Sequence, residues 1–219
     1  AIQIPHSMTY WSAASHNIVW LQTNTLTTDT VDVYYTEASI TNWQVIVTNY
    51  TTEVSGIGVT ASCTWNTTAV TSGQYKVKVE AHENTNVYNV SATFTIDSDP
   101  PYITGARFIS DTEMVVEFNE IVDVVHPLSF ALPITCASGI VSWSSIDNIT
   151  SVTFTISGLS ANCQCAGSTL SVSGGAVIDL AGNPISAATF PVARDNTPPT
   201  VTVVDVSPEP ASAVTVDFT

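Results

Sequence analysis

Hydrophobic residues fall in short runs rich in β-branched and aromatic side chains, separated by clusters of Thr, Asn, Ser and Gly. No window keeps the 3.6-residue apolar repeat of an amphipathic helix, so the pattern predicts an all-β chain. The runs expected to be strands are 16–20, 31–35, 43–47, 57–65, 74–80 and 90–96, then 104–108, 113–122, 140–143, 152–156, 170–172 and 188–192.

The run 74–80 alternates strictly between apolar and polar residues. Its odd positions, from Tyr75 to Val79, are expected in a core, and its even positions, from Lys76 to Glu80, in water. A Ser-Gly turn precedes Tyr75, which places this residue where a tyrosine corner would lie. The first hundred residues are therefore expected to form a seven-strand sandwich.

A proline pair occurs twice, at Pro100-Pro101 and at Pro198-Pro199, and strand-like runs flank each copy. A diproline has two fixed φ angles and no backbone donors, so it stiffens a junction and cannot continue a central strand. The spacing predicts tandem immunoglobulin-like β-sandwiches over 1–98 and 99–196, with the first strands of a third, incomplete module over 197–219.

The first module resembles the immunoglobulin-like N-terminal domain of yeast cell-wall β-1,6-glucan assembly proteins, which Ser/Thr-rich glycosylphosphatidylinositol-anchored membrane proteins share. The resemblance rests on Trp11 and on the segments 17–20, 31–33, 63–65, 72–79 and 91–96. It implies a cell-surface or wall-associated module close to a mature N-terminus, and it carries no catalytic residues.

The second module resembles the bacterial immunoglobulin-like domains found in tandem in large surface proteins. Segment 116–122 reads Val-x-Phe-x-Glu-x-Val, and segment 179–184 reads Asp-x-Ala-Gly-Asn-Pro, which is also good turn chemistry. The resemblance spans about 100–193. It does not account for the cysteines of this module.

The net charge of the chain limits the classes of molecule that it is expected to bind. Four basic residues stand against 19 acidic ones, a formal charge of −15, which argues against nucleic acid or an anionic membrane as a partner. Only 11% of residues are charged, while 32 Thr and 24 Ser supply the polar surface, a pattern that suits a secreted, extracellular or cell-surface protein. No apolar run approaches the roughly 18 residues that span a bilayer, and no signal sequence opens the chain, so we expect a mature or excised segment.

Four Asn-x-Ser/Thr sequons are candidate glycosylation sites in a eukaryotic secreted protein. They begin at Asn49, Asn66, Asn89 and Asn148.

The four cysteines fit an oxidising compartment, and two bridges among them can form in three ways. Cys63 alternates with apolar residues, so we expect a buried free thiol. Cys136 paired with Cys163 or with Cys165 is the expected disulfide. A metal at these three cysteines is disfavoured because no histidine lies near them.

No catalytic constellation emerges, so we expect no enzyme and no required cofactor. The acidic residues along 113–123 are expected on a solvated strand face, and the four histidines are scattered. Calcium is the metal that the sequence favours, because hard oxygen ligands lie at both junctions. These are Asp97 and Asp99 at the first, and Asp195 and Asn196 at the second.

We therefore expect an extracellular structural or adhesive repeat protein that self-associates or contacts neighbouring modules through edge strands. It would be a subunit or segment of a surface layer, appendage or filament. The alternative is a carbohydrate-binding accessory module of a larger wall-active protein that contacts cell-wall glycans. An exposed tryptophan row on the first module would favour that alternative, whereas Trp20 and Trp65 are expected in the core.

Overall fold

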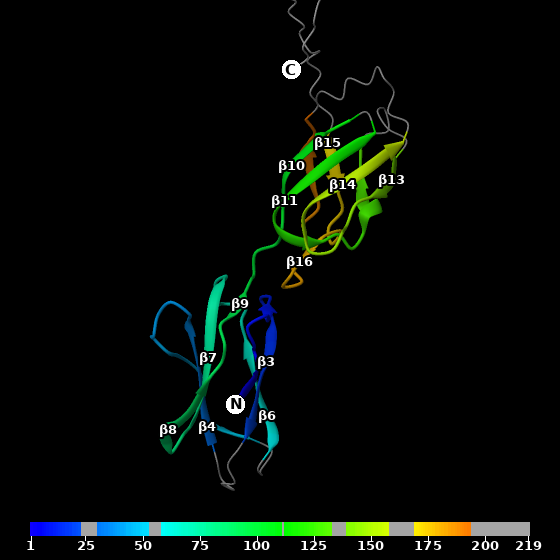
Figure 1. Cartoon of the computed structure of the whole chain (residues 1–219). Helices are drawn as coiled ribbons and strands as arrows, with labels where there is room; N and C mark the ends of the chain where they lie inside the picture. The colour runs from blue at the N-terminus through cyan, green and yellow to red at the C-terminus, as the bar shows by residue number, and fades with distance from the viewer. Residues whose placement is uncertain (23–29, 53–57, 111, 133–138, 158–168, 194–219) are drawn as a thin grey trace, which may run out of the picture.

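The computed structural model describes residues 1–22, 30–52, 58–110, 112–132, 139–157 and 169–193. Two sheets make up the first module (Figure 1). One has the order β1-β3-β6, with β1 (Ile2–Ile4), β3 (Ser15–Gln22) and β6 (Val59–Asn66). The other has the order β2-β9-β7-β4-β5, with β2 (Tyr10–Trp11), β9 (Phe94–Ile96), β7 (Gly73–Ala81), β4 (Thr30–Glu37) and β5 (Gln44–Thr51), and β8 (Asn84–Val90) also pairs with β7.

The core of the first module lies between these two sheets. Ile18 of β3 and Trp65 of β6 pack in one cluster with Val33 of β4, Val77 of β7 and Phe94 of β9. Successive side chains of a strand point to opposite faces, and burial of these inward-pointing residues stabilises both sheets at once. The arrangement is consistent with a β-sandwich.

The run 90–96, expected as one strand, is divided between β8 and β9, which pair with successive stretches of β7. Buried Ser91 lies at the break, where its N–H donates to Val77 O at 2.8 Å and its Oγ accepts from Val77 N at 3.0 Å. The side chain thus takes part in the ladder where the strand is interrupted.

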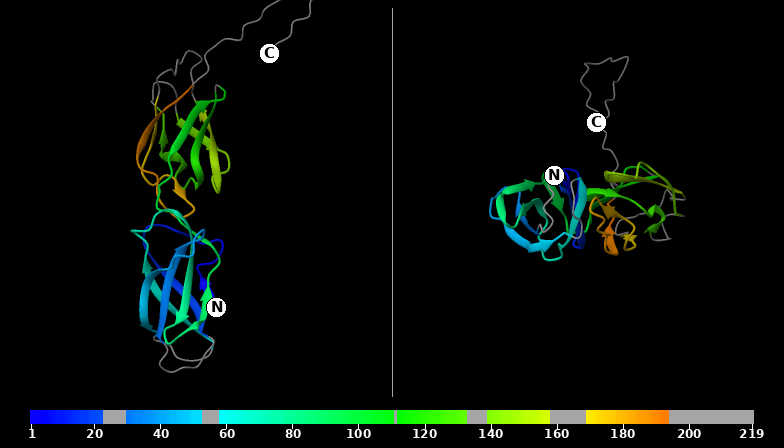
Figure 2. Two further views of the ribbon diagram at one scale, coloured as in Figure 1. Left: turned by 90° about the vertical axis from the view of Figure 1, so that its left-hand side faces the viewer. Right: turned by 90° about the horizontal axis from the view of Figure 1, so that it is seen from below.

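The second module also has two sheets (Figures 1 and 2). One has the order β10-β11-β14-β13, with β10 (Ile103–Phe108), β11 (Glu113–Asp123), β14 (Ile149–Ser157) and β13 (Gly139–Trp143), and β16 (Ile178–Asp179) pairs with β11. The other has the order β12-β15-β17, with β12 (Phe130–Ala131), β15 (Thr169–Val172) and β17 (Ala188–Pro191). Their shared core, from Ile103 to Val192, has no residue in common with the first core.

The expectation of an all-β chain is confirmed. The only helix among the described residues is the short 3-10 turn Pro127–Ser129, so no helix there could cross a bilayer. The predicted third module, 197–219, lies outside the described residues. The module boundaries at 98 and 196 stay predictions.

The alternation in β7 is confirmed on one face only. Tyr75, Val77 and Val79 are buried, as expected. Glu80 was expected in water but is only 7% exposed, and the Lys78 side chain is 17% exposed. The expectation failed because aromatic rings from neighbouring strands gather around Lys78 on this outer face.

Candidate functional site

Three carboxylates from distant parts of the sequence meet where the two modules join. Asp97 follows β9, Glu120 lies in β11 and Asp179 ends β16, and their carboxylate oxygens lie within 4.8 Å of one another. Only Asp179 is fully buried. We call Asp97, Glu120 and Asp179 the junction triad.

The Asp179 side chain is held by the turn that follows it. Its Oδ1 accepts hydrogen bonds from Ala181 N and Asn183 N, both at 2.8 Å. Gly182 has φ +86°, a left-handed conformation that glycine adopts without the strain a Cβ brings. The Asp-x-Ala-Gly-Asn-Pro segment therefore fixes one carboxylate of the triad in place.

Asn183 links the two modules. Its Nδ2 donates to Asp179 Oδ2 at 2.7 Å and to the backbone carbonyl of Asp97 at 2.8 Å. Both hydrogens of this amide are thus used, and the residue is buried. The side chain of Asp97 is held from its own module, because its Oδ1 accepts from Asp99 N at 3.1 Å.

The carboxylates of the junction triad repel one another. Burial raises the pKa of Glu120, and the charges of Asp97, Asp179 and Asp99 raise it further, while the hydrogen bond from Asn119 opposes these effects. No basic residue is among the causes of this shift. Among the described residues, the hydrogen bonds to this charge come from amide groups and from the Ser72 hydroxyl, which are all neutral donors.

Asp97 and Asp99, which the sequence singled out, both lie at this junction, and Asp99 is exposed. Asp195 and Asn196 lie outside the described residues. Glu120 and Asp179 were missed as ligands. Glu120 had been placed on the solvated face of 113–123, yet it has the even parity of the buried positions Met114 to Val124, which was the signal available in the sequence.

Hard carboxylate oxygens are what Ca²⁺ prefers, and a Ca²⁺ ion takes six to eight oxygen ligands. The triad offers three carboxylates, so such an ion would complete its coordination with backbone oxygens or water. The donor set fits calcium better than zinc, because it contains neither histidine nor cysteine.

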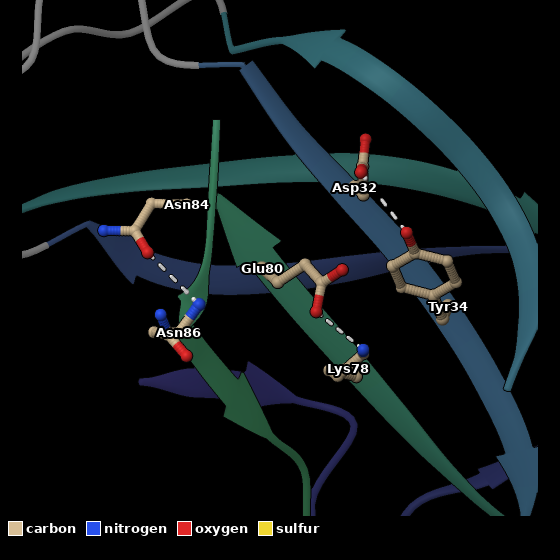
Figure 3. A network of polar contacts seen from close by, with 6 residues as sticks. All are labelled: Asp32, Tyr34, Lys78, Glu80, Asn84 and Asn86. Carbon is tan, nitrogen blue, oxygen red and sulfur yellow. Dashed lines mark hydrogen bonds and ion pairs between the residues drawn. The ribbon is translucent and has the colours of Figure 1, made fainter. Parts of the chain in front are cut away.

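A second cluster lies on the outer face of β4, β7 and β8. We call Lys78, Glu80, Tyr34, Trp43 and Tyr88 the lysine face. Figure 3 shows three of these residues, Lys78, Glu80 and Tyr34. Lys78 Nζ lies 2.6 Å from Glu80 Oε2 and 4.5, 5.4 and 6.0 Å from the ring centroids of Tyr34, Trp43 and Tyr88. Each distance is within the range of a cation–π contact. Four segments of the chain therefore converge on one ammonium group.

Asp32 lies beside the lysine face and is fully partnered. It accepts from Asn49 N at 2.7 Å, from Tyr34 Oη at 3.2 Å, and lies 2.8 Å from His82 Nδ1. Burial alone would raise the pKa of Asp32, but these hydrogen bonds and the charge of His82 lower it overall. Burial and the nearby Asp32 and Glu80 charges raise the pKa of Tyr34 to about 12.

The other predicted residues are dispersed. All four sequon asparagines are exposed: Asn49, Asn66, Asn89 and Asn148. Cys63 is a buried free thiol, as expected, and burial raises its pKa to about 11. Cys136, Cys163 and Cys165 lie outside the described residues, so their pairing stays a prediction.

The tryptophans do not form an exposed row. Trp20 and Trp65 are each 5% exposed, which confirms their expected place in the core, and Trp11 is also buried. Trp43 is half-buried on the lysine face, and Trp143 lies on the second module. The most exposed aromatic side chains of the first module are therefore tyrosines rather than tryptophans.

Comparison with models of known protein families and with curated protein sequences finds no match for this chain.

Proposed function

We propose that this chain is an extracellular structural or adhesive repeat protein, built from immunoglobulin-like sandwiches whose junction is stiffened by a bound calcium ion. The observation that carries the proposal is the junction triad, since an ion held by Asp97 of one module and by Glu120 and Asp179 of the next would restrict their relative motion. The role is mechanical and needs no catalytic group.

The immunoglobulin-like assignment draws support from Tyr75. Its hydroxyl donates to the backbone carbonyl of Thr71 at 2.8 Å, four residues upstream and just before β7. This hydrogen bond is the hallmark of a tyrosine corner in such sandwiches. The paired sheets and the module length agree with the same fold class.

Self-association would use the edge strands. Among the described strands, β13 lies at the edge of its sheet, and it exposes Val141 (58%) and Trp143 (38%). An exposed apolar edge without lysine or proline is a template for pairing with another strand. A second copy of the chain could extend the sheet there, as expected of a layer, appendage or filament. The four exposed sequon asparagines would carry the glycans of such a glycoprotein.

The decisive experiment is light scattering with electron microscopy on purified protein, with calcium, after chelation, and after glycosidase treatment. Regular assemblies or rods that become shorter or more variable on chelation would support the proposal. A monomer whose dimensions and calorimetric unfolding are the same with calcium and with chelator would contradict both the self-association and the junction ion.

The alternative function is a carbohydrate-binding accessory module of a larger wall-active protein. Burial of Trp11, Trp20 and Trp65 removes the tryptophan row on which that alternative depended. The lysine face is the remaining aromatic surface of the first module that could support it.

A further inference from the structure

We propose that the lysine face is a binding site for a neutral polysaccharide. This inference goes beyond the mechanical role, and it does not depend on the junction ion. Three aromatic rings and a salt-bridged lysine lie on the outer face of one sheet, where a structural sandwich needs only a solvated polar surface.

The exposed rings provide apolar area for a flat ligand. Tyr88 on the edge strand β8 is 59% exposed, and Trp43 and Tyr34 are half-buried around the same ammonium group. Such side chains combine a large apolar face with a polar atom. The C–H face of a sugar ring could stack on them while its hydroxyl groups reach the polar groups between.

The central polar group is held rigidly. Register pairs Tyr34 with Lys78 and Asp32 with Glu80 across β4 and β7, so the charged side chains stand in two adjacent rows. Lys78 is fixed by Glu80, and Glu80 is 7% exposed. A preorganised site of this kind loses little side-chain entropy when a ligand binds.

A cavity of about 280 Å³ adjoins the lysine face. Glu80 and Tyr88 line this cavity together with Asn84 and Gln22.

These groups select the charge of the ligand. Carboxylates accept hydrogen bonds, and the chain carries a formal charge of −15, so an anionic polymer is disfavoured. Lys78 Nζ lies closest to the Tyr34 ring, at 4.5 Å, so the rings of Trp43 and Tyr88 are the ones left for stacking. A neutral, hydroxyl-rich polymer can use both these rings and the hydrogen-bond acceptors.

The test is isothermal titration of glycosidase-treated protein with a soluble β-glucan, an α-mannan and a xylan, and with polygalacturonate as the anionic comparison. Tyr88→Ala and Trp43→Ala should each weaken binding of the preferred neutral polymer at least about tenfold. Tyr102→Ala, which removes an aromatic ring as exposed as that of Tyr88 but outside the lysine face, should leave binding unchanged.

Circular dichroism and thermal unfolding would show that each variant keeps its fold. The inference is wrong if none of the neutral polymers binds, if polygalacturonate binds as tightly, or if the Tyr88 and Trp43 variants bind like the unaltered protein. An equal loss of binding with Tyr102→Ala would also overturn it. Calcium and chelator affect none of these readings, so the two proposals fail separately.

Discussion

The lysine face and the junction triad are both acidic clusters, but they are neutralised differently. At the lysine face, Glu80 has Lys78 at 2.6 Å, and beside it Asp32 has His82 Nδ1 at 2.8 Å. At the junction, the described donors to Asp179 and Asp97 are neutral amide and hydroxyl groups, and burial and the nearby carboxylates raise the pKa of Glu120. The lysine face thus contains a permanent cation, Lys78, whereas none of the described residues forms an ion pair with the junction triad.

The difference is informative because cations are scarce in this chain. It has only Lys76, Lys78, Arg107 and Arg194 as permanently basic residues. One of the four is used on the lysine face, and Arg107 is paired with Glu117 on an exposed strand surface. A buried or clustered carboxylate that lacks a partner is costly, so an external cation is the simplest partner for the junction.

The largest effect is expected from Asp179→Ala. The change removes an acceptor of three hydrogen bonds and leaves buried amide donors unpaired, so we expect a loss of about 2–4 kcal/mol in the stability of the second module. Calorimetry measures the loss. Asp147→Ala, at an exposed position, is the control and should change stability little. Similar values for both variants would mean that the turn does not depend on this carboxylate.

Asp32→Ala should cost somewhat less, about 1–3 kcal/mol, because it unpairs Asn49 N, Tyr34 Oη and His82 in the first module. Because the folded-state pKa of Asp32 is lowered, its stabilisation is present above the ordinary value of 3.8 and is lost as the pH falls through the folded value. Tryptophan fluorescence during urea unfolding follows this module. Glu37→Ala is the control. If the stability difference between Asp32→Ala and Glu37→Ala does not shrink in acid, the assignment is wrong.

In the presence of chelator, Glu120→Gln should raise the stability of the protein rather than lower it. The raised pKa means that folding is favoured by protonation, so stability falls as the pH rises above the ordinary value of 4.5. The variant removes this repulsion and should gain at most about 1 kcal/mol, since the side chain is partly in water. It should also lose most of the stabilisation that calcium gives the unaltered protein. An undiminished calcium response would exclude Glu120 as a ligand.

The smallest effect concerns Tyr34. Its phenol should ionise near pH 12, because burial and the nearby carboxylates disfavour the tyrosinate form. Asp32→Asn removes one of the charges that raise the pKa, so Tyr34 should then titrate at lower pH. Tyrosinate absorbance, with Tyr34→Phe to isolate the signal, makes the measurement. A titration unaltered by Asp32→Asn would mean that Asp32 does not contribute to this pKa.

Much of the sheet structure could be predicted, because strict alternation and β-branched runs encode strands that are buried on one face. β8 could not, since its sequence Asn84–Val90 is polar and the strand is exposed on both faces except at Val90. Its pairing depends on hydrogen bonds to β7 rather than on a hydrophobic pattern. The alternation rule also failed at Glu80, because burial on the outer face depends on side chains from other strands.

The junction was predictable in location but not in composition. The Asp before each diproline pointed to the seam, whereas Asp179 is brought there by the fold from 82 positions beyond Asp97. Alternation carries no information about which turn of one module meets the end of another. Glu120 was the exception, since an acidic residue at an inward parity position is a local anomaly that can be seen in sequence.

Strand β9 is the last strand of the first module, so it bears any force that is transmitted from the second module. It is short, but it pairs with β7 on one side and in parallel with β2 on the other, and the chain leaves it directly for the next module. Hydrogen bonds in both ladders run across the strand, so a force transmitted through Pro100-Pro101 would load them together in shear rather than open them one at a time. We expect the first module to resist pulling along the chain, and single-molecule stretching would show whether a weakened β2–β9 pairing lowers the unfolding force.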